Sequence, residues 1–345
     1  MRLVLSGSWL KKDGFYEAKI EGVHIIKLED LEGLEGIHFL VLSYDLTSYT
    51  LGVHIKESGL PKLLAIKLDR FERINTPSYI DANLTFISSS LSDKDFMDRV
   101  RTTKDFIRDG FIYQLNLTNR FDFSLERGKP FDLFYQFIQR QAVPYGFFLD
   151  LGEFFIVSGS MELFLERVGK RLLSKPIKGT SNLEESLRRS QKDKSENLMI
   201  TDMVRNDFGR IARPGSVRVT ELFKITQYST LFQMHSSVEC RTDKILLDVI
   251  RATFPPASVT GAPKRKAVEI INMLEPHERG FYCGCAGLFF DNFNFILSVL
   301  IRTAIGKGKV LSYYAGCGIV WDSDPKRELE ELYTKTKAFY DFRIL

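Results

Sequence analysis

The sequence predicts an α+β fold built on antiparallel sheets. Many runs of strand character are joined by hairpin turn signals, and helical patterns are interspersed among them without strict alternation. The chain also contains 28 Phe and 13 Tyr, residue types that favour strands. With 345 residues, 44% of them hydrophobic, it can bury the core of one large domain or of two ordinary ones.

The N-terminal part, residues 1–90, is poor in motifs. Short apolar runs at residues 37–42 and 63–68 are broken by Gly, Pro and charged residues, which is typical of strands. No low-complexity linker precedes residue 91. We therefore expect residues 1–90 to form a strand-rich part that packs on a larger domain of residues 91–345.

A helix is expected directly after this boundary. Ser92 is suited to the N-cap, the apolar positions between Phe96 and Ile107 follow helical spacing, and Gly110 ends the pattern. Residues 113–123 then alternate apolar with polar side chains, which predicts a strand.

The remaining elements follow from the same periodicities. Residues 146–175 predict a meander of four strands, with turn signals at Gly152 and Gly169. Further elements are expected as helices at 184–207 and 263–274, as strands at 295–305 and 310–319, and as a final helix that begins at Pro325.

Composition narrows the classes of partner. The formal net charge of +4, from 48 basic and 44 acidic residues, suits a small anionic substrate, and no Lys/Arg cluster interleaved with aromatics points to nucleic acid. No stretch approaches the roughly 20 apolar residues of a membrane helix, and the N-terminal apolar run is too short for a signal peptide. The four cysteines fit reduced, buried thiols. We expect a cytoplasmic protein without a membrane or nucleic-acid partner.

Two pairs of carboxylates stand out in the predicted helices. Asp193 and Glu196 are three residues apart, as are Glu328 and Glu331, so each pair shares one helix face. Taken alone, either pair is more simply a solvated acidic surface. Carboxylates are also the ligands that Mg²⁺ prefers.

Four ordered segments carry a family resemblance: residues 176–180 (Pro-Ile-Lys-Gly-Thr), 195–207, 260–264, and 315–320 followed by the acidic helix. In order and spacing they resemble the chorismate-using enzymes, namely anthranilate, aminodeoxychorismate, isochorismate and salicylate synthases, over roughly residues 91–345. The resemblance implies the layered α/β sandwich of anthranilate synthase and aminodeoxychorismate synthase component I, with antiparallel sheets at its centre. It also implies chorismate as the substrate.

The resemblance implies binding roles for several residues. Glu196 and Glu331 would bind Mg²⁺, supported from the outer shell by Asp193 and Glu328. Arg302, expected in the middle of a strand, would clamp the carboxylate of the enolpyruvyl arm, although an Arg there is as often a structural ion pair. The other substrate-binding positions are Tyr282, Gly179, Thr180, Ser258, Gly316, Gly318 and Lys335.

Three further residues match positions that handle protons in the family. Glu162 matches the general acid that protonates the departing ring hydroxyl, although Met161 replaces the usual Pro before it. His235 matches a His near the ring, where a core His is the simpler interpretation. Gln114, also placed at the substrate, stands where isochorismate and salicylate synthases carry a Lys base. Because Gln cannot activate water, we expect an amine nucleophile.

Lys178 separates the remaining members of the family. Anthranilate synthases have Ala there, whereas aminodeoxychorismate synthases have Lys. A neutral lysine amine, favoured by burial or by neighbouring cations, can attack ring carbon 2, and ammonia can then attack ring carbon 4. A surface lysine is the plainer interpretation of this residue in isolation. The following segment, Ser181-Asn182-Leu183, departs from the Pro-Arg or Arg usual in the family.

These residues predict aminodeoxychorismate synthase component I. The chain would convert chorismate and ammonia to 4-amino-4-deoxychorismate, for 4-aminobenzoate and folate synthesis. It contains no candidate Cys-His-Glu glutaminase module, so a glutamine amidotransferase subunit would supply the ammonia. The alternatives are anthranilate synthase component I, which would share every site except Lys178, and a non-catalytic subunit of the same fold.

Overall fold

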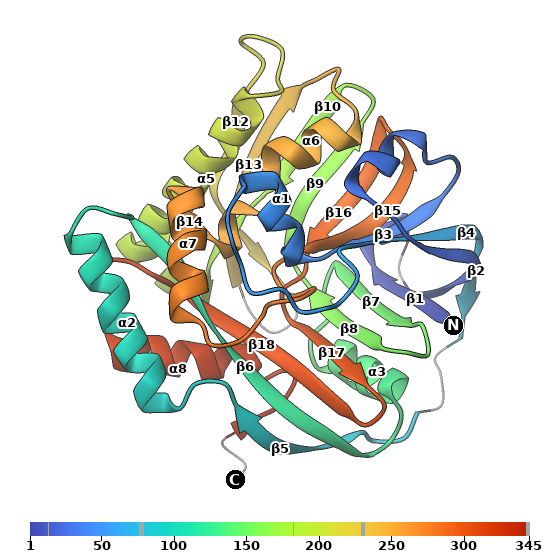
Figure 1. The fold of residues 1–345 in the computed structure, drawn as a ribbon, viewed down its shortest axis with the longest axis horizontal. Coiled ribbons are helices and arrows are strands. Elements are labelled where there is room, and N and C mark those ends of the chain that lie inside the picture. The colour runs from blue at the N-terminus through green and yellow to red at the C-terminus, as the bar shows by residue number, and fades with distance from the viewer. Residues whose placement is uncertain (13, 76–78, 182, 229–231, 343–345) are drawn as a thin grey trace.

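The structure is a computed structural model that describes residues 1–12, 14–75, 79–181, 183–228 and 232–342 (Figure 1). Every strand pairing in it is antiparallel, and helices cover the outside of the sheet, which confirms the predicted α+β sandwich. The strands are β1 (Arg2–Gly7), β2 (Phe15–Ile25), β3 (His38–Leu42), β4 (Leu63–Ile74), β5 (Asn83–Ser89), β6 (Gln114–Arg127), β7 (Tyr145–Asp150), β8 (Phe155–Ser160), β9 (Leu163–Val168), β10 (Arg171–Lys175), β11 (Ile177–Ser181), β12 (Arg218–Gln227), β13 (Phe232–Arg241), β14 (Gly261–Ala262), β15 (Cys285–Asp291), β16 (Asn294–Val299), β17 (Thr303–Lys307) and β18 (Val310–Ile319). The α-helices are α1 (Thr47–Leu51), α2 (Asp93–Arg108), α3 (Pro130–Arg140), α4 (Glu184–Arg189), α5 (Gln191–Gly209), α6 (Leu246–Thr253), α7 (Lys264–Leu274) and α8 (Pro325–Thr336).

The strands form one hydrogen-bonded network with two halves. The first half-sheet runs in the order β5, β6, β18, β17, β8, β7, β1. The second half-sheet runs in the order β3, β15, β16, β9, β10, β13, β12. Strands β2 and β4 join the two halves through β1 and β3, so one continuous sheet folds over into the two layers of the sandwich.

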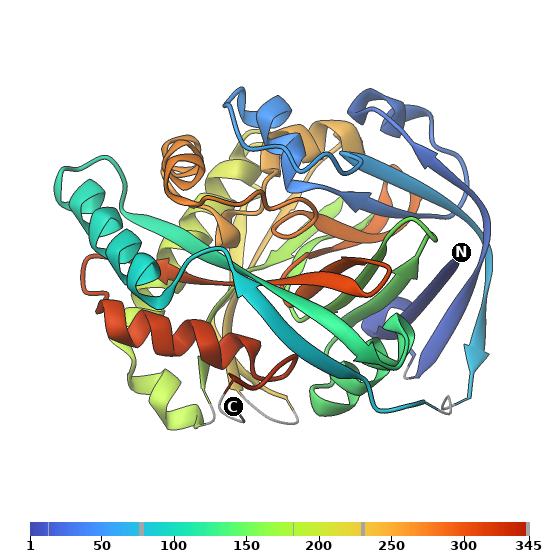
Figure 2. The same ribbon diagram turned by 60° about the horizontal axis from the view of Figure 1, so that its bottom comes forward.

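Three buried clusters hold these layers together. One packs α2, α3 and α8 on the first half-sheet, and a second packs α5 and α6 on the second half-sheet. The third lies between the two halves and includes Leu5, Phe39, Phe147 and Leu288 from β1, β3, β7 and β15. Figure 2 shows the strands at the centre with α2, α3, α5 and α8 around them.

The N-terminal strands belong to the same sheet as the strands that follow. Strand β1 pairs with β7, and β3 pairs with β15. The expected strands at residues 37–42 and 63–68 correspond to β3 and the first part of β4. The domain boundary at residue 90 stays a prediction.

The predicted meander at residues 146–175 is wrong in one respect. Strands β7 and β8 form one hairpin and β9 and β10 another, but β8 pairs with β17 while β9 pairs with β16. The chain therefore crosses from the first half-sheet to the second between Ser160 and Leu163. It crosses back between Val299 and Thr303, which divides the single strand expected at 295–305.

The helix expected at residues 184–207 is also divided, into α4 and α5. Ser190, between them, has an extended backbone, and its side chain accepts a hydrogen bond from the amide of Asp193. A capping serine competes with helix continuation, so α5 begins afresh with Asp193 in its first turn.

All four cysteines are buried free thiols, as expected. Among the described residues, no helix is both long and apolar enough to cross a membrane.

Candidate functional site

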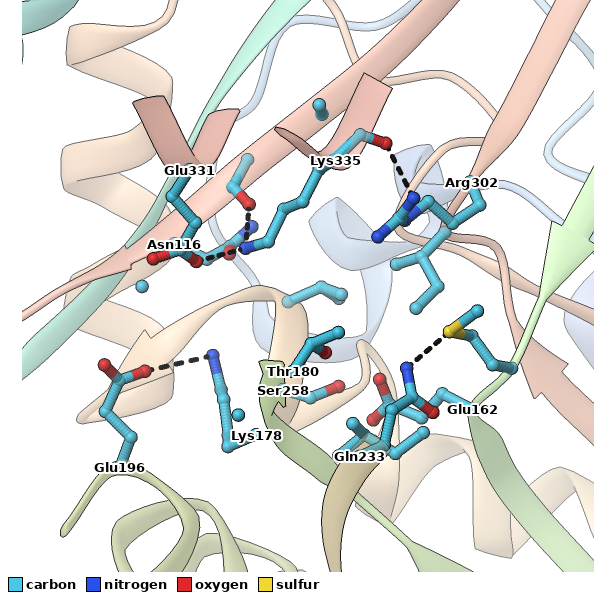
Figure 3. A pocket seen from close by; sticks show the side chains of 18 of the residues that line it. Asn116, Glu162, Lys178, Thr180, Glu196, Gln233, Ser258, Arg302, Glu331 and Lys335 are labelled. Carbon is cyan, nitrogen blue, oxygen red and sulfur yellow. Dashed lines mark hydrogen bonds and ion pairs between the residues drawn. The ribbon is translucent and has the colours of Figure 1, made fainter. Parts of the chain in front are cut away.

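A cavity of about 220 Å³ lies where the two half-sheets exchange strands (Figure 3). The structure brings most of the residues singled out in the sequence to its wall. These are Glu162, Lys178, Gly179, Thr180, Asp193, Glu196, Ser258, Tyr282, Arg302, Gly316, Gly318, Glu331 and Lys335.

The two chain crossings place Glu162 and Arg302 at this cavity. The crossings lie side by side, because the amide of Val299 donates to the carbonyl of Glu162 at 3.0 Å and the amide of Gly159 donates to the carbonyl of Arg302 at 3.0 Å. The expectation that Arg302 lies in the middle of a strand is therefore wrong. Its backbone has a φ of 53°, in the left-handed region that non-glycine residues rarely adopt.

A β-bulge directs Lys178 into the cavity. Ile177 pairs with His235 and Thr180 with Gln233, so β11 has one residue more than β13 over this stretch. Gly179, inside the bulge, has a φ of 89°, and a Cβ on it would lie 3.0 Å from the side chain of Asp193. Lys178 is only 9% exposed although it lines the cavity.

Lysines and glutamates alternate at one end of the cavity. Lys178 Nζ lies 3.8 Å from Glu196 Oε2. Lys335 Nζ lies 2.7 Å from Glu331 Oε1 and donates to the carbonyl of Gly316 at 2.7 Å. Burial opposes ionisation of Glu331, yet the ammonium groups of Lys335, Lys192 and Lys178 together lower its pKa to about 2. Burial raises the pKa of Glu196.

Lys192 holds three carboxylates together behind this end. Its Nζ lies 2.6 Å from Glu328 Oε1 and 3.9 Å from an oxygen of each of Glu196 and Glu331. Glu328 is buried away from the lining, and its Oε2 has no hydrogen-bond partner among the described residues. The carboxylate oxygens of Glu196, Glu328 and Glu331 thus surround a positive charge, that of Lys192.

Glu196 and Glu331, each with an oxygen 3.9 Å from Lys192 Nζ, offer carboxylate donors of the kind that Mg²⁺ takes. Glu328 and Glu331 lie with Cys317 in a group whose ligand atoms are all within 4.8 Å of one another. Burial raises the pKa of the Cys317 thiol well above its usual value, so the sulfur stays protonated and only carboxylate oxygens are left for a hard ion.

Arg302 and two tyrosines form the opposite end of the cavity. Arg302 Nη1 donates to the carbonyl of Lys335 at 2.7 Å, which leaves other guanidinium N–H groups for a ligand (Figure 3). The ring of Tyr282 stacks on that of Tyr314 at 5.0 Å and 13°. The arrangement suits a planar anionic group.

The environment of Glu162 differs from that of Glu331, because burial and not neighbouring lysines dominates its pKa. It is 4% exposed, and burial raises its pKa to about 7, although Ser258, Lys178 and the backbone of Ile177 act in the opposite direction. A carboxyl group with such a pKa can be protonated or ionised near neutral pH, as an acid catalyst requires.

His235 and Gln114, both expected at the substrate, lie behind the described lining, and so does Glu328, which was expected only to support the metal ligands from the outer shell. His235, expected near the ring, lies on β13 with Nε2 2.9 Å from Thr226 Oγ1, because it pairs with the start of β11 before the bulge. Gln114 donates from Nε2 to Glu196 Oε2 at 3.3 Å. Glu328 is held by Lys192. Asn182, one of the departures from the family pattern, lies outside the described residues.

Sequence reasoning missed several residues that the structure places in the lining: Asn116, Gln233, Tyr314 and Thr334. Strand alternation carried part of the signal, because Tyr314 is two residues from Gly316 and Asn116 two from Gln114 on the same strand faces. No signal in the sequence pointed to Lys192, which contacts three carboxylates.

A family model described as chorismate binding enzyme matches residues 50–341. The chain belongs to this family. Aminodeoxychorismate synthase component 1 of Bacillus subtilis (strain 168) is 32% identical over 348 residues, which cover 94% of this chain and 74% of that protein. Anthranilate synthase component 1 of Aquifex aeolicus is 35% identical over 262 residues, 72% of this chain. The chain spans about half of that relative's length, with 53% covered.

Solved structures show the same fold. Anthranilate synthase component I from Streptococcus pneumoniae TIGR4 superposes with a TM-score of 0.79 at 23% identity, covering 99% of this chain and 92% of that one. MenF, the menaquinone-specific isochorismate synthase from Escherichia coli, gives a TM-score of 0.81 at 16% identity, covering 98% of this chain and 87% of that one. At these identities the likeness is one of fold alone.

Proposed function

We propose that the protein is aminodeoxychorismate synthase component I, which converts chorismate and ammonia to 4-amino-4-deoxychorismate. The observation that carries the proposal is Lys178, buried and directed into the cavity by a bulge, on the same wall as Glu162. A buried amine beside a titratable acid is the pair that covalent displacement of a hydroxyl requires.

The two carboxylates of chorismate match the two ends of the cavity. Glu196 and Glu331 would hold Mg²⁺, whose charge neutralises the ring carboxylate when it is bound. Lys335, between Glu331 and the carbonyl of Gly316, adds a positive charge at this end. Arg302 would hold the enolpyruvyl carboxylate, because its planar guanidinium binds carboxylates through two N–H groups. Substrate fixed at both ends keeps its ring over Lys178.

Apart from chorismate and ammonia, the bond-forming and proton-transfer steps then use only Lys178 and Glu162 of this chain. Lys178 first releases its ammonium proton to solvent, and the neutral amine then attacks ring carbon 2, Glu162 gives its proton to the hydroxyl at carbon 4, and water leaves. This first step leaves a secondary ammonium on carbon 2 and an ionised Glu162. Ammonia attacks carbon 4, the bond to Lys178 breaks, and Glu162 takes one proton from the new amine. Glu162 is then protonated again, and Lys178 is again a neutral amine.

Ammonia would come from a glutamine amidotransferase subunit. The relatives named component 1 support this part of the proposal, and so does the demand of the reaction for a nitrogen nucleophile in place of water. We place the reaction in 4-aminobenzoate and folate synthesis, in the cytoplasm.

Anthranilate synthase is the second candidate, because relatives of that name are equally similar in sequence. The test is to incubate the purified chain with chorismate, Mg²⁺ and ammonium and to identify the product by mass. We expect 4-amino-4-deoxychorismate without release of pyruvate. Anthranilate together with pyruvate would overturn the proposal in favour of the second candidate, and absence of any product would favour a non-catalytic subunit.

A further inference from the structure

The side-chain amide of Gln233 has no role in the reaction described above, although it is buried in the cavity wall with an unpaired oxygen among the described residues. It lines the cavity from β13 at 3% exposure. Its Nε2 contacts Met161 Sδ, while its Oε1 is buried and has no hydrogen-bond partner among the described residues. A buried acceptor left unpaired in a cavity wall is costly unless a ligand satisfies it.

Gln233 lies where the second step of the proposed reaction takes place. It pairs with Thr180 at the end of the bulge that carries Lys178. Figure 3 shows it beside Glu162, on the wall opposite Glu331 and Lys335. Glu162 is the residue expected at ring carbon 4, so the free amide oxygen lies at the end of the cavity where the incoming nitrogen must bind.

We propose that Gln233 is the binding residue for ammonia, which it holds through Oε1 for attack on ring carbon 4. This inference rests on the proposed function and adds the site of the second substrate.

A neutral acceptor is the group that this step needs. Ammonia must point its lone pair at the carbon, so its three N–H groups have to be held by acceptors. A carboxylate in the same place would favour ammonium, which has no lone pair to give. An amide oxygen accepts the N–H without adding negative charge.

The proton balance agrees with this arrangement. The bond from nitrogen to carbon 4 forms, the bond from carbon 2 to Lys178 breaks, and the electron pair passes through the ring to the departing lysine nitrogen. The new amine then carries one surplus proton. Glu162, ionised since the first step, accepts it. Gln233 exchanges no proton and serves only to position the nucleophile.

The experiment separates the two steps with the full chain. Chorismate and Mg²⁺ without ammonium should give a covalent adduct on Lys178, detected by intact mass, and ammonium added afterwards should consume it. For Gln233→Met, which removes the acceptor at similar size, we expect adduct formation at the unmodified rate and consumption slowed about 10- to 100-fold. Gln233→Glu places a carboxylate there, which favours ammonium over ammonia, so its consumption at neutral pH should also be slowed and should recover more than that of Gln233→Met as the pH is raised.

Gln139→Met, the same substitution at an exposed position of α3, is the matched control. Consumption by either Gln233→Met or Gln233→Glu at the unmodified rate would overturn the ammonia site. Should Gln233→Met form no adduct, the rate of Gln233→Glu decides alone. Absence of any adduct in the unmodified chain would instead overturn the proposed function.

Discussion

Glu331 and Glu162 are the same kind of residue on opposite walls of one cavity, yet their pKa values are shifted in opposite directions. On the α8 wall, Glu331 is ion-paired with Lys335 at 2.7 Å and its pKa is lowered to about 2. On the β8–β9 wall, burial dominates and the pKa of Glu162 is raised to about 7. The first carboxylate is a permanent charge, whereas the second can exchange a proton near neutral pH.

Under the proposed function, this difference divides substrate binding from chemistry within one cavity. Fixed charges suit the anchoring of an anionic substrate and its metal, because they do not change during turnover. A poorly solvated acid and a buried amine suit the reaction itself, because both have to change protonation or bonding state. Substitutions on the two walls should therefore fail in different ways.

The largest effect is expected for Lys178→Ala, which removes the proposed nucleophile from the wall that also carries Glu162. Turnover with ammonium should fall by at least about 10³-fold, as for removal of other covalent nucleophiles. Chorismate binding should persist, because the α8 wall is unchanged. Product formation and chorismate affinity are the measurements, and Lys170→Ala, an exposed lysine in the β9–β10 turn, is the control. Near-normal turnover would exclude Lys178 as the nucleophile.

Glu162→Gln should lower turnover by about 10²–10⁴, the usual contribution of a positioned acid. In the unmodified chain the acid form is present below its pKa of about 7, so kcat/KM should fall as pH rises through that value. The variant should lose this limb of the pH profile. Glu153→Gln, at an exposed turn position, should keep both the rate and the limb. A limb that persists in Glu162→Gln must belong to another group.

Glu331→Gln tests the charged wall. We expect the Mg²⁺ concentration for half-maximal turnover to rise at least about 10-fold, since even residues that only support metal ligands contribute about that much. Saturating Mg²⁺ should restore part of the rate, which it cannot do for Lys178→Ala. Glu330→Gln, the exposed neighbour on α8, is the control. Full activity of Glu331→Gln at low Mg²⁺ would contradict the metal assignment.

The smallest effect is expected where the two walls meet. A Cβ on Gly318 would lie 2.6 Å from Gln114 Nε2, 2.7 Å from Glu196 Oε2 and 3.1 Å from Lys178 Nζ. Gly318→Ala should displace these side chains and reduce kcat/KM for chorismate about 10-fold, with the melting temperature little changed. Gly209→Ala, whose Cβ would meet nothing within 4 Å, is the matched control. Unchanged kinetics would show that the close packing at Gly318 has no role in catalysis.

The sequence by itself determined the elements and the chemistry available to them. Period-two alternation identified β6, the stripe from Phe96 to Ile107 identified α2, and Ser92 gave its cap, since its side chain accepts from the amide of Asp95. These signals are local, so they can be read from neighbouring residues. The ordered segments likewise identified the family that the comparison confirms.

Only the tertiary structure decided how those side chains act together. The crossings at Glu162 and Arg302 depend on which distant strand each neighbour pairs with, and the bulge at Lys178 depends on its register with β13. Whether a glutamate is charged depends on burial and on lysines far away in the chain, such as Lys192 for Glu331. Strand pairing and desolvation are long-range effects, so no local pattern could fix them.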